Sequence, residues 1–185
     1  MRQSFAGGVP TPKWYVAIVQ RNREELCRKD LESLGYEAYV ASQKETHVYR
    51  NRHRREITRI VIPGIVFIHI AESQRLQLLK STPYIQFFMT DKASLTLASG
   101  RRPFAIIPDH QMDTLRFMLY NADAPVSFID TPLQLGDPIR VIRGNLQGLE
   151  GTYLRDANST HILVSLDLLG SAAVTISPLD IEKLK

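Results

Sequence analysis

The pattern of hydrophobic and polar residues near the start of the chain changes from the period of a strand to that of a helix. Residues 14–19, WYVAIV, are β-branched and aromatic, which predicts a strand. Asn22 stands three positions before Glu25, the spacing of a capping box. Apolar residues then recur at helical spacing up to Gly35, which can end a helix in a left-handed conformation. We therefore predict a strand followed by an amphipathic helix.

The same periods predict the elements that follow, up to about residue 120. In chain order these are an extended segment over 36–49, a strand over 59–70 interrupted at Pro63–Gly64, a helix over 73–81 with Leu76 and Leu79 facing inward, a strand over 84–89, a hairpin over 93–107 around Gly100, and a helix from Pro108. The order β-α-β-β-α-β is that of the ferredoxin-like split βαβ arrangement. We therefore predict an α+β fold with a ferredoxin-like N-terminal domain that carries an extra hairpin and helix.

The pattern changes again at Asn121. Residues 121–134 are rich in proline and small polar residues, which indicates a linker. Short apolar runs separated by glycines then predict a small, strongly bent β-barrel of the SH3-like kind. The expected division is a loose N-terminal tail over 1–12, an N-terminal domain over 13–120, a linker over 121–134 and the barrel over 135–185.

Composition narrows the class of protein. The 185 residues are 44% hydrophobic and 23% charged, which is typical of a folded chain. No apolar run reaches the roughly 20 residues of a membrane-spanning helix, and the single cysteine, Cys27, cannot form an internal disulfide. We expect a cytoplasmic protein without a membrane partner.

Motifs for catalysis or cofactor binding are not found in the sequence. It contains no phosphate loop, zinc cluster or paired-cysteine motif, and its five histidines lack metal-ligand spacing. Cys27 lies on the apolar stripe of the first predicted helix, which favours a core residue over a nucleophile. We therefore expect no cofactor, no metal and no enzymatic activity.

Positive charge is concentrated in one segment. Between Arg50 and Arg59 there are five arginines and one glutamate, a local sum of +4 that equals the net charge of the whole chain. Such a segment suits contacts with phosphates, which position a protein without reading sequence. Tyr49 and His53 could stack on unpaired bases. The alternative is a solvated charged loop that only keeps the protein soluble.

Two stretches resemble known motifs. Residues 136–154, GDPIRVIRGNLQGLEGTYL, resemble the KOW motif, and they depart from it at Asn145 and Leu146, where the family often has Pro-Phe. WYVAIVQRNRE at the start of the N-terminal domain and IVIPGIVFI over 60–68 resemble the N-terminal domain of NusG-type transcription factors. In this order the two motifs resemble the NusG family over nearly the whole chain, and most of all its specialised RfaH- and UpxY-type antiterminators.

The resemblance implies a transcription elongation and antitermination factor that acts without covalent chemistry. Its N-terminal domain is expected to bind the clamp helices of RNA polymerase and to touch non-template DNA or nascent RNA. The KOW domain is expected to recruit a ribosomal protein or Rho, and the targets are expected to be polysaccharide operons. The alternative is a ribosome-associated or general RNA-binding KOW protein.

The resemblance, together with the concentration of positive charge, indicates three groups of site residues. The polymerase-binding group is Trp14, Val16, Ile18, Ile62, Pro63, Gly64, Ile65 and Phe67; the nucleic-acid-binding group is Arg21, Arg23, Arg50, Arg52, His53, Arg54 and Arg55; and the KOW partner surface contains Leu146 and Leu149. For the first group a plainer interpretation stays open, because alternate positions of any strand serve the core.

Overall fold

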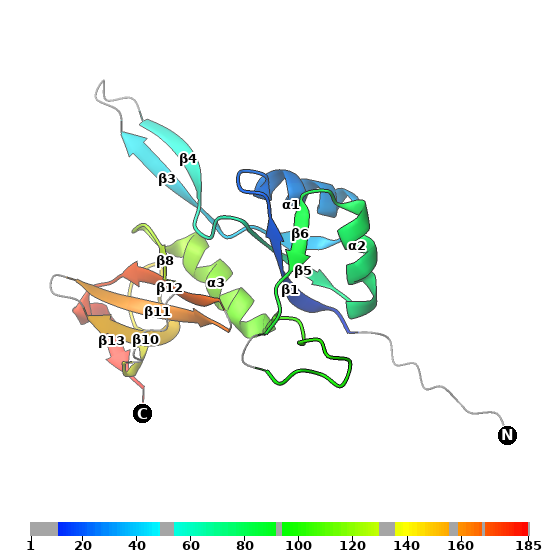
Figure 1. Ribbon diagram of the computed structural model, residues 1–185. Helices are drawn as coiled ribbons and strands as arrows, with labels where there is room; N and C mark the ends of the chain where they lie inside the picture. The colour runs from blue at the N-terminus through cyan, green and yellow to red at the C-terminus, as the bar shows by residue number, and fades with distance from the viewer. Residues whose placement is uncertain are drawn as a thin grey trace. The chain divides into compact units, whose positions relative to one another are not determined.

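The computed structural model describes residues 11–48, 54–91, 94–129, 136–155, 159–167 and 169–184, and it shows a mixed α and β fold (Figure 1). The chain divides into two compact units. The first unit comprises Met1–Tyr39 and Gly64–Ile106, and the second comprises Val40–Pro63 and Ile107–Lys185. No helix in these described ranges is long and apolar enough to cross a membrane.

The first unit is an antiparallel sheet with two helices. Its elements are β1 (Lys13–Val19), α1 (Glu24–Ser33), β2 (Glu37–Tyr39), β5 (Ile65–Ile70), α2 (Arg75–Ser81), β6 (Ile85–Phe88) and the short β7 (Ile106–Ile107). The sheet order is β2-β5-β1-β6, with β7 also paired to β1. Strand β1 is antiparallel to β5 and β6, and β2 is antiparallel to β5. The two central strands are therefore β1 and β5, and they carry the most apolar sequence of the unit.

Helix α1 forms where the sequence predicts it, but it begins differently. The predicted capping box at Asn22 is wrong, because the helix starts at Glu24 with Arg23 at the N-cap and no side-chain cap. Asn22 instead takes a positive φ of 63°, the left-handed conformation that asparagine tolerates better than most residues. Gly35 ends the helix region with φ 83°, as predicted.

Helix α2 presents a different face to the core than its apolar pattern predicts. Leu76, expected to face inward, is 64% exposed, whereas Leu78 and Arg75 are buried. The Arg75 guanidinium lies 3.1 Å from the centroid of the Phe104 ring. Burial lowers the pKa of Arg75, with Glu72 acting in the opposite direction. On the inward face of α2, where the apolar pattern predicts Leu76, the structure thus has Arg75 packed on an aromatic ring.

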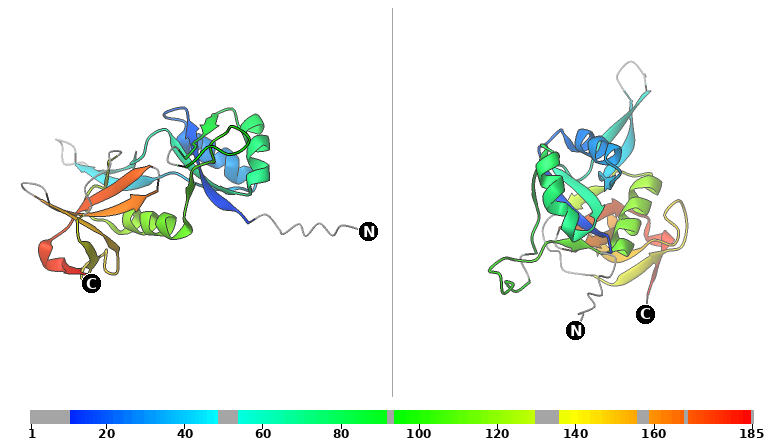
Figure 2. Two further views of the ribbon diagram at one scale, coloured as in Figure 1. Left: turned by 60° about the horizontal axis from the view of Figure 1, so that its bottom comes forward. Right: turned by 90° about the vertical axis from the view of Figure 1, so that its right-hand side faces the viewer.

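The second unit joins a two-stranded hairpin, one helix and a six-stranded sheet. Its elements are β3 (Ser42–Val48), β4 (Arg54–Ile60), α3 (Asp109–Asn121), β8 (Ser127–Ile129), β9 (Pro138–Val141), β10 (Glu150–Arg155), β11 (Thr160–Leu166), β12 (Gly170–Thr175) and β13 (Ile181–Lys183). Strands β3 and β4 pair along their whole length. The six-stranded sheet has the order β13-β9-β10-β11-β12-β8, and α3 packs on β11 (Figure 2).

The predicted strand over 59–70 is two strands in different sheets. Strand β4 ends at Ile60 and β5 begins at Ile65, and Gly64 between them has φ 78°. The basic segment between Arg50 and Arg59 supplies much of β4, because Arg54, Arg55 and Arg59 lie in that strand. The arginines are therefore carried by a regular hairpin in the residues that the structure describes.

Two other predicted segments also differ. Residues 127–129, in the stretch expected to be a linker, form β8 and pair with β12. The hairpin expected over 93–107 keeps its turn at Gly100, with φ 74°, but its only pairing in the described residues is a single bridge from Thr90 to Phe104 and the short β7. The two compact units are defined by contacts between residues and not by folding as separate domains. The expected boundaries of the N-terminal domain, linker and barrel therefore stay a prediction.

Glycines allow the strands of the C-terminal sheet to approach closely. A Cβ atom at Gly136 would lie 2.0 Å from the Tyr153 carbonyl oxygen, and one at Gly151 would lie 2.3 Å from the Leu163 carbonyl oxygen. Both glycines belong to the stretch that resembles the KOW motif. A larger residue at Gly151 would push β10 and β11 apart, and one at Gly136 would push the residues before β9 away from β10, which gives both positions of the motif a physical reason.

Candidate functional site

Five of the eight residues expected to bind a polymerase lie on one face of the first unit's sheet. Across β1 and β5, Val16 is paired with Phe67 and Ile18 with Ile65. Trp14 lies on the same face, two residues before Val16. We call Trp14, Val16, Ile18, Ile65 and Phe67 the apolar sheet face.

Most of the apolar sheet face is buried. Val16 and Phe67 are 0% exposed and Trp14 is 3% exposed, whereas Ile18 is half-buried. The Trp14 ring stacks on the ring of His69, with 4.8 Å between the centroids. The structure brings these residues together on one face of the sheet, and their role in binding a polymerase stays a prediction.

The remaining three residues of this group belong to the turn between β4 and β5. Ile62 and Gly64 are buried, and Pro63 is exposed. The Gly64 carbonyl oxygen accepts a hydrogen bond from the Val19 backbone N–H at 2.9 Å. The turn is thus fastened to the end of β1, and Pro63 is its exposed point.

Glu24 also holds this turn, and the sequence gives no sign of it. The Gly64 backbone N–H donates to Glu24 Oε1 at 2.7 Å. Glu24 is only 1% exposed, and its Oε2 has no hydrogen-bond partner among the described residues. A glutamate in the first turn of a helix usually only favours the helix dipole, so its contact 40 residues away is not visible in the pattern.

The basic hairpin divides its arginines between solvent and structure. Arg54 and Arg55 are exposed on β4. Arg59 is half-buried; its Nε donates to Glu45 Oε1 at 2.5 Å and its Nη2 donates to the Val126 carbonyl oxygen at 2.8 Å. Arg54 and Arg55 are therefore available to an anionic partner, whereas Arg59 is engaged within the unit.

The other members of the nucleic-acid-binding group lie elsewhere. Arg21 and Arg23 are exposed in the turn before α1, in the first unit. Arg50, Arg52 and His53 lie outside the described residues. The structure thus places four of the seven residues, and it places them in two separate units.

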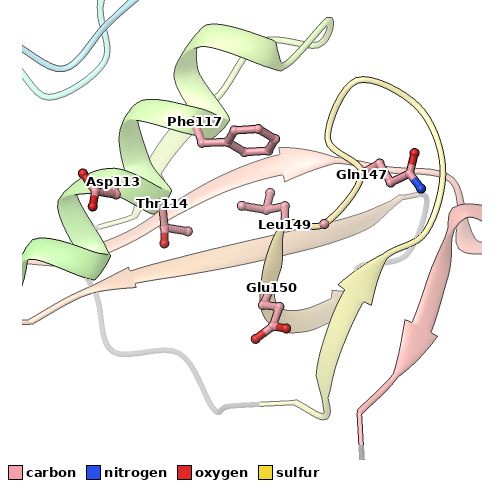
Figure 3. A pocket seen from close by; sticks show the side chains of 7 residues that line it. Asp113, Thr114, Phe117, Gln147, Leu149 and Glu150 are labelled. Carbon is pink, nitrogen blue, oxygen red and sulfur yellow. The ribbon is translucent and has the colours of Figure 1, made fainter.

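The two leucines expected to form the KOW partner surface are buried. Leu146 is 8% exposed and Leu149 is 3% exposed. Leu149 lines a pocket of about 420 Å³ together with Phe117 of α3, whose ring points toward it (Figure 3). Both leucines are thus buried in this structure, Leu149 beside α3, and their role as a KOW partner surface stays a prediction.

Asn145, where the chain departs from the KOW pattern, has a contact of its own. Its side-chain amide donates to both carboxylate oxygens of Asp123, at 3.0 and 2.9 Å. The proline that the family often carries at this position could not make that contact. The departure from the KOW pattern at Asn145 therefore coincides with a hydrogen-bonded contact between the loop before β10 and the residues after α3.

Metal-binding clusters and a reactive cysteine are not found in the described residues. No group of three or more metal-binding side chains occurs in them. Burial, with a smaller contribution from Asp30, raises the pKa of the buried Cys27 thiol to about 12. The thiol therefore stays protonated near neutral pH and is a poor nucleophile.

Comparison with known families identifies the chain. Residues 12–116 match the family model described as NusG, transcription termination factor nusG. The chain belongs to the NusG family. The match covers more than half of this NusG-family chain and includes both strands of the apolar sheet face. The family resemblance of the N-terminal motifs is thereby confirmed.

Solved structures add support for the fold. The structure titled "Domain interaction in Thermotoga maritima NusG" matches this NusG-family chain with a TM-score of 0.50 and 18% identity, over 96% of this chain and 100% of that one. Conformations A and B of the MjSpt4:Spt5 complex match with TM-scores of 0.28 and 0.30, at 10% and 11% identity, over 92% of this chain and 97% and 96% of those chains. Scores as low as the last two do not establish a common arrangement. No curated protein matches the chain.

Proposed function

We propose that this chain regulates transcription elongation by binding RNA polymerase and the nucleic acid that the polymerase exposes. The family match carries the proposal, because the NusG family is a family of transcription factors. The chain acts without covalent chemistry, in the cytoplasm and without a cofactor. We further propose the specialised form of this role, an operon-specific antiterminator of the RfaH or UpxY type that acts on polysaccharide operons.

The proposed architecture is a ferredoxin-like NusG N-terminal domain followed by a KOW barrel. The sheet order β2-β5-β1-β6 supports the first part, because a split βαβ arrangement places its strands in that order. The close backbone approaches at Gly136 and Gly151 support the second part. The KOW domain in this proposal recruits a ribosomal protein or Rho.

The polymerase contact is assigned to the apolar sheet face and to the turn that contains Pro63 and Gly64. Ile18, half-buried, and Pro63, exposed, are the members of this group that a partner can reach. Covering about 300 Å² of apolar surface at about 25 cal/mol per Å² contributes several kcal/mol before the costs of association. A factor that binds the closed clamp better than the open clamp shifts the polymerase toward the closed, elongating state.

The nucleic-acid contact is assigned to the basic hairpin. Arg54 and Arg55 are exposed on one strand, next to the further arginines of the segment. Exposed arginines neutralise phosphates and do not distinguish one base sequence from another. Because neutralised phosphates release counterions, the affinity for non-template DNA or nascent RNA falls steeply as the salt concentration rises.

The deciding experiment measures affinity for purified RNA polymerase, with a clamp-helix peptide as competitor. We expect binding that the peptide displaces and that Ile18→Asp weakens at least tenfold. Leu179→Asp is the matched control, because Leu179 is 80% exposed and lies in the second unit. Co-sedimentation with ribosomes in the absence of polymerase binding would refute the proposal and favour an RNA-binding KOW protein. A run-on transcription assay then measures whether pausing and termination decrease.

A further inference from the structure

The side chain of Gln43 binds a segment of backbone about 80 residues away. Gln43 lies on β3 and is 4% exposed. Its Nε2 donates to the carbonyl oxygens of Ala122 and Ala124, at 3.1 and 3.0 Å. Its Oε1 accepts from the Val126 backbone N–H at 2.8 Å. One amide group thus pairs with alternate residues of an extended segment, much as a neighbouring strand would.

Each of these hydrogen bonds satisfies a polar group of the Gln43 side chain that would otherwise be buried without a partner. The amide of glutamine has two N–H donors and one carbonyl oxygen, and all are used here. Buried polar groups without a partner are destabilising, so a residue of another shape cannot replace Gln43 without a cost in stability. The arrangement is specific to glutamine at this position.

The second strand of the hairpin holds the same segment. Arg59 is the cross-strand partner of Gln43, and its Nη2 donates to the Val126 carbonyl oxygen at 2.8 Å. Glu45, on the same face of β3, accepts from Arg59 Nε and directs the guanidinium. We call Gln43, Arg59 and the backbone of residues 122–126 the hairpin clasp.

The clasped segment is itself tied to the C-terminal sheet. Asp123 is bonded to Asn145 in the loop before β10. Immediately after the segment, β8 pairs with β12. The clasp therefore connects the base of the hairpin to the end of α3 and to the six-stranded sheet, all within the second unit.

Because the hairpin extends away from its base, the angle at the base determines where its far end lies. A two-stranded hairpin is marginally stable by itself. From Gln43 to the last residue of β3, Val48, the strand extends about 17 Å at about 3.4 Å per residue. A small change of angle at the base thus moves the charged end of β4 by several ångströms.

We propose that Gln43 is the positioning residue of the basic hairpin and that, with Arg59, it fixes the direction in which β4 presents Arg54 and Arg55. The proposal rests on the nucleic-acid contact assigned above. A hairpin held in one direction loses less freedom on binding than one that swings at its base, so the clasp raises affinity without touching nucleic acid. The clasp also makes the hairpin move with the C-terminal sheet.

The test compares Gln43→Glu with Gln77→Glu in the full chain. Gln43→Glu keeps the acceptor for Val126 and removes both donors, and Gln77 is an exposed glutamine of α2 that serves as the matched control. We expect faster hydrogen exchange at Val126 and along β3 and β4 for Gln43→Glu only. Affinity for a labelled single-stranded oligonucleotide should fall about three- to tenfold. Its dependence on salt concentration should stay unchanged, because the same phosphates are neutralised.

A distance measurement separates direction from affinity. Spin labels on Glu56→Cys in β4 and Leu179→Cys just before β13 report the spread of the hairpin's positions, and the protonated, buried Cys27 does not interfere. Gln43→Glu should broaden the distance distribution, and Gln77→Glu should leave it as in the wild type. A distribution that stays narrow in Gln43→Glu would overturn the proposal. So would a broadened distribution with unchanged oligonucleotide affinity.

Failure of the underlying function gives a different result. If the wild-type chain binds no oligonucleotide at any salt concentration, the assigned nucleic-acid contact is refuted together with the role of Gln43 in it. The distance measurement then still decides whether Gln43 orients the hairpin. If Gln43→Glu does not fold, Arg59→Lys serves in its place, because a single ammonium nitrogen keeps the charge but does not reproduce the two guanidinium nitrogens that bond Glu45 and the Val126 carbonyl oxygen.

Discussion

The apolar sheet face and the basic hairpin both consist of paired antiparallel strands, yet different interactions hold them in place. The sheet face is held by burial along β1 and β5, where Val16 and Phe67 have no exposed surface. The hairpin buries little of itself, and its place is set by hydrogen bonds from Gln43 and Arg59 to a distant segment. We therefore expect the sheet face to be sensitive to a loss of buried volume, and the base of the hairpin to be sensitive to the loss of a hydrogen-bond donor.

The largest effect is expected at the centre of the sheet face. Phe67→Ala removes a fully buried ring and should lower the free energy of unfolding of the first unit by about 3–5 kcal/mol. Urea denaturation measures the change. Arg54→Ala on the hairpin is the comparison, with an expected change below about 0.5 kcal/mol. A decrease below about 1 kcal/mol for Phe67→Ala would mean that the face is not core.

The contact between Glu24 and the turn should have the next largest effect. Glu24→Ala leaves the buried Gly64 N–H without its acceptor and should cost about 1–3 kcal/mol of unfolding free energy. Glu24→Gln keeps an acceptor oxygen and should cost clearly less. Thermal denaturation of the two variants decides between them, and equal decreases would show that the hydrogen bond to Gly64 is not the cause.

Charge reversal on the hairpin should separate binding from stability. Arg54→Glu with Arg55→Glu should leave the free energy of unfolding within about 0.5 kcal/mol of the wild type, because both side chains are exposed. The slope of log affinity for single-stranded nucleic acid against log salt should fall by about 0.7 for each phosphate that the protein no longer neutralises. Binding titrations at several salt concentrations measure the slope. An unchanged slope would mean that these arginines do not contact phosphates.

The smallest effect is expected where the segment after α3 meets the loop before β10. Asn145→Ala removes an exposed hydrogen bond to Asp123 and should cost only about 0.5 kcal/mol, because water replaces the partner. Asn145→Asp is the sharper change, since it places a second carboxylate beside Asp123. Chemical denaturation should rank the two variants in that order, and a decrease above about 2 kcal/mol for Asn145→Ala would show that the link is more than peripheral.

Elements governed by local pattern could be predicted from the sequence. Strand β1, the region of α1 and the left-handed Gly35 follow from β-branched residues, helical spacing and glycine at the helix end. The residues of the apolar sheet face are named from the family resemblance, and their alternation along two antiparallel strands explains why they lie on one face. What the pattern does not decide is whether such a face is covered, since core and contact surfaces have the same alternation.

Features that depend on distant partners could not be predicted. Arg75 takes an inward position because Phe104 provides a ring for it, and this displaces Leu76 to the surface. Gln43 and Glu24 look like ordinary polar residues of a strand and a helix, and each binds backbone 40 or more residues away. Nothing in a local window of sequence marks those partners, because the tertiary fold alone brings them together.

The separation of Gln43 from Val126 has a consequence during protein synthesis. The two residues are 83 positions apart, so at about 5–20 residues per second the ribosome adds Val126 about 4–17 s after Gln43. Throughout that interval the nascent hairpin carries its arginines with no anchor at its base. Newly made chains therefore pass through a stage in which Gln43 lacks its backbone partners, while the cationic segment is close to the anionic RNA of the ribosome that makes them.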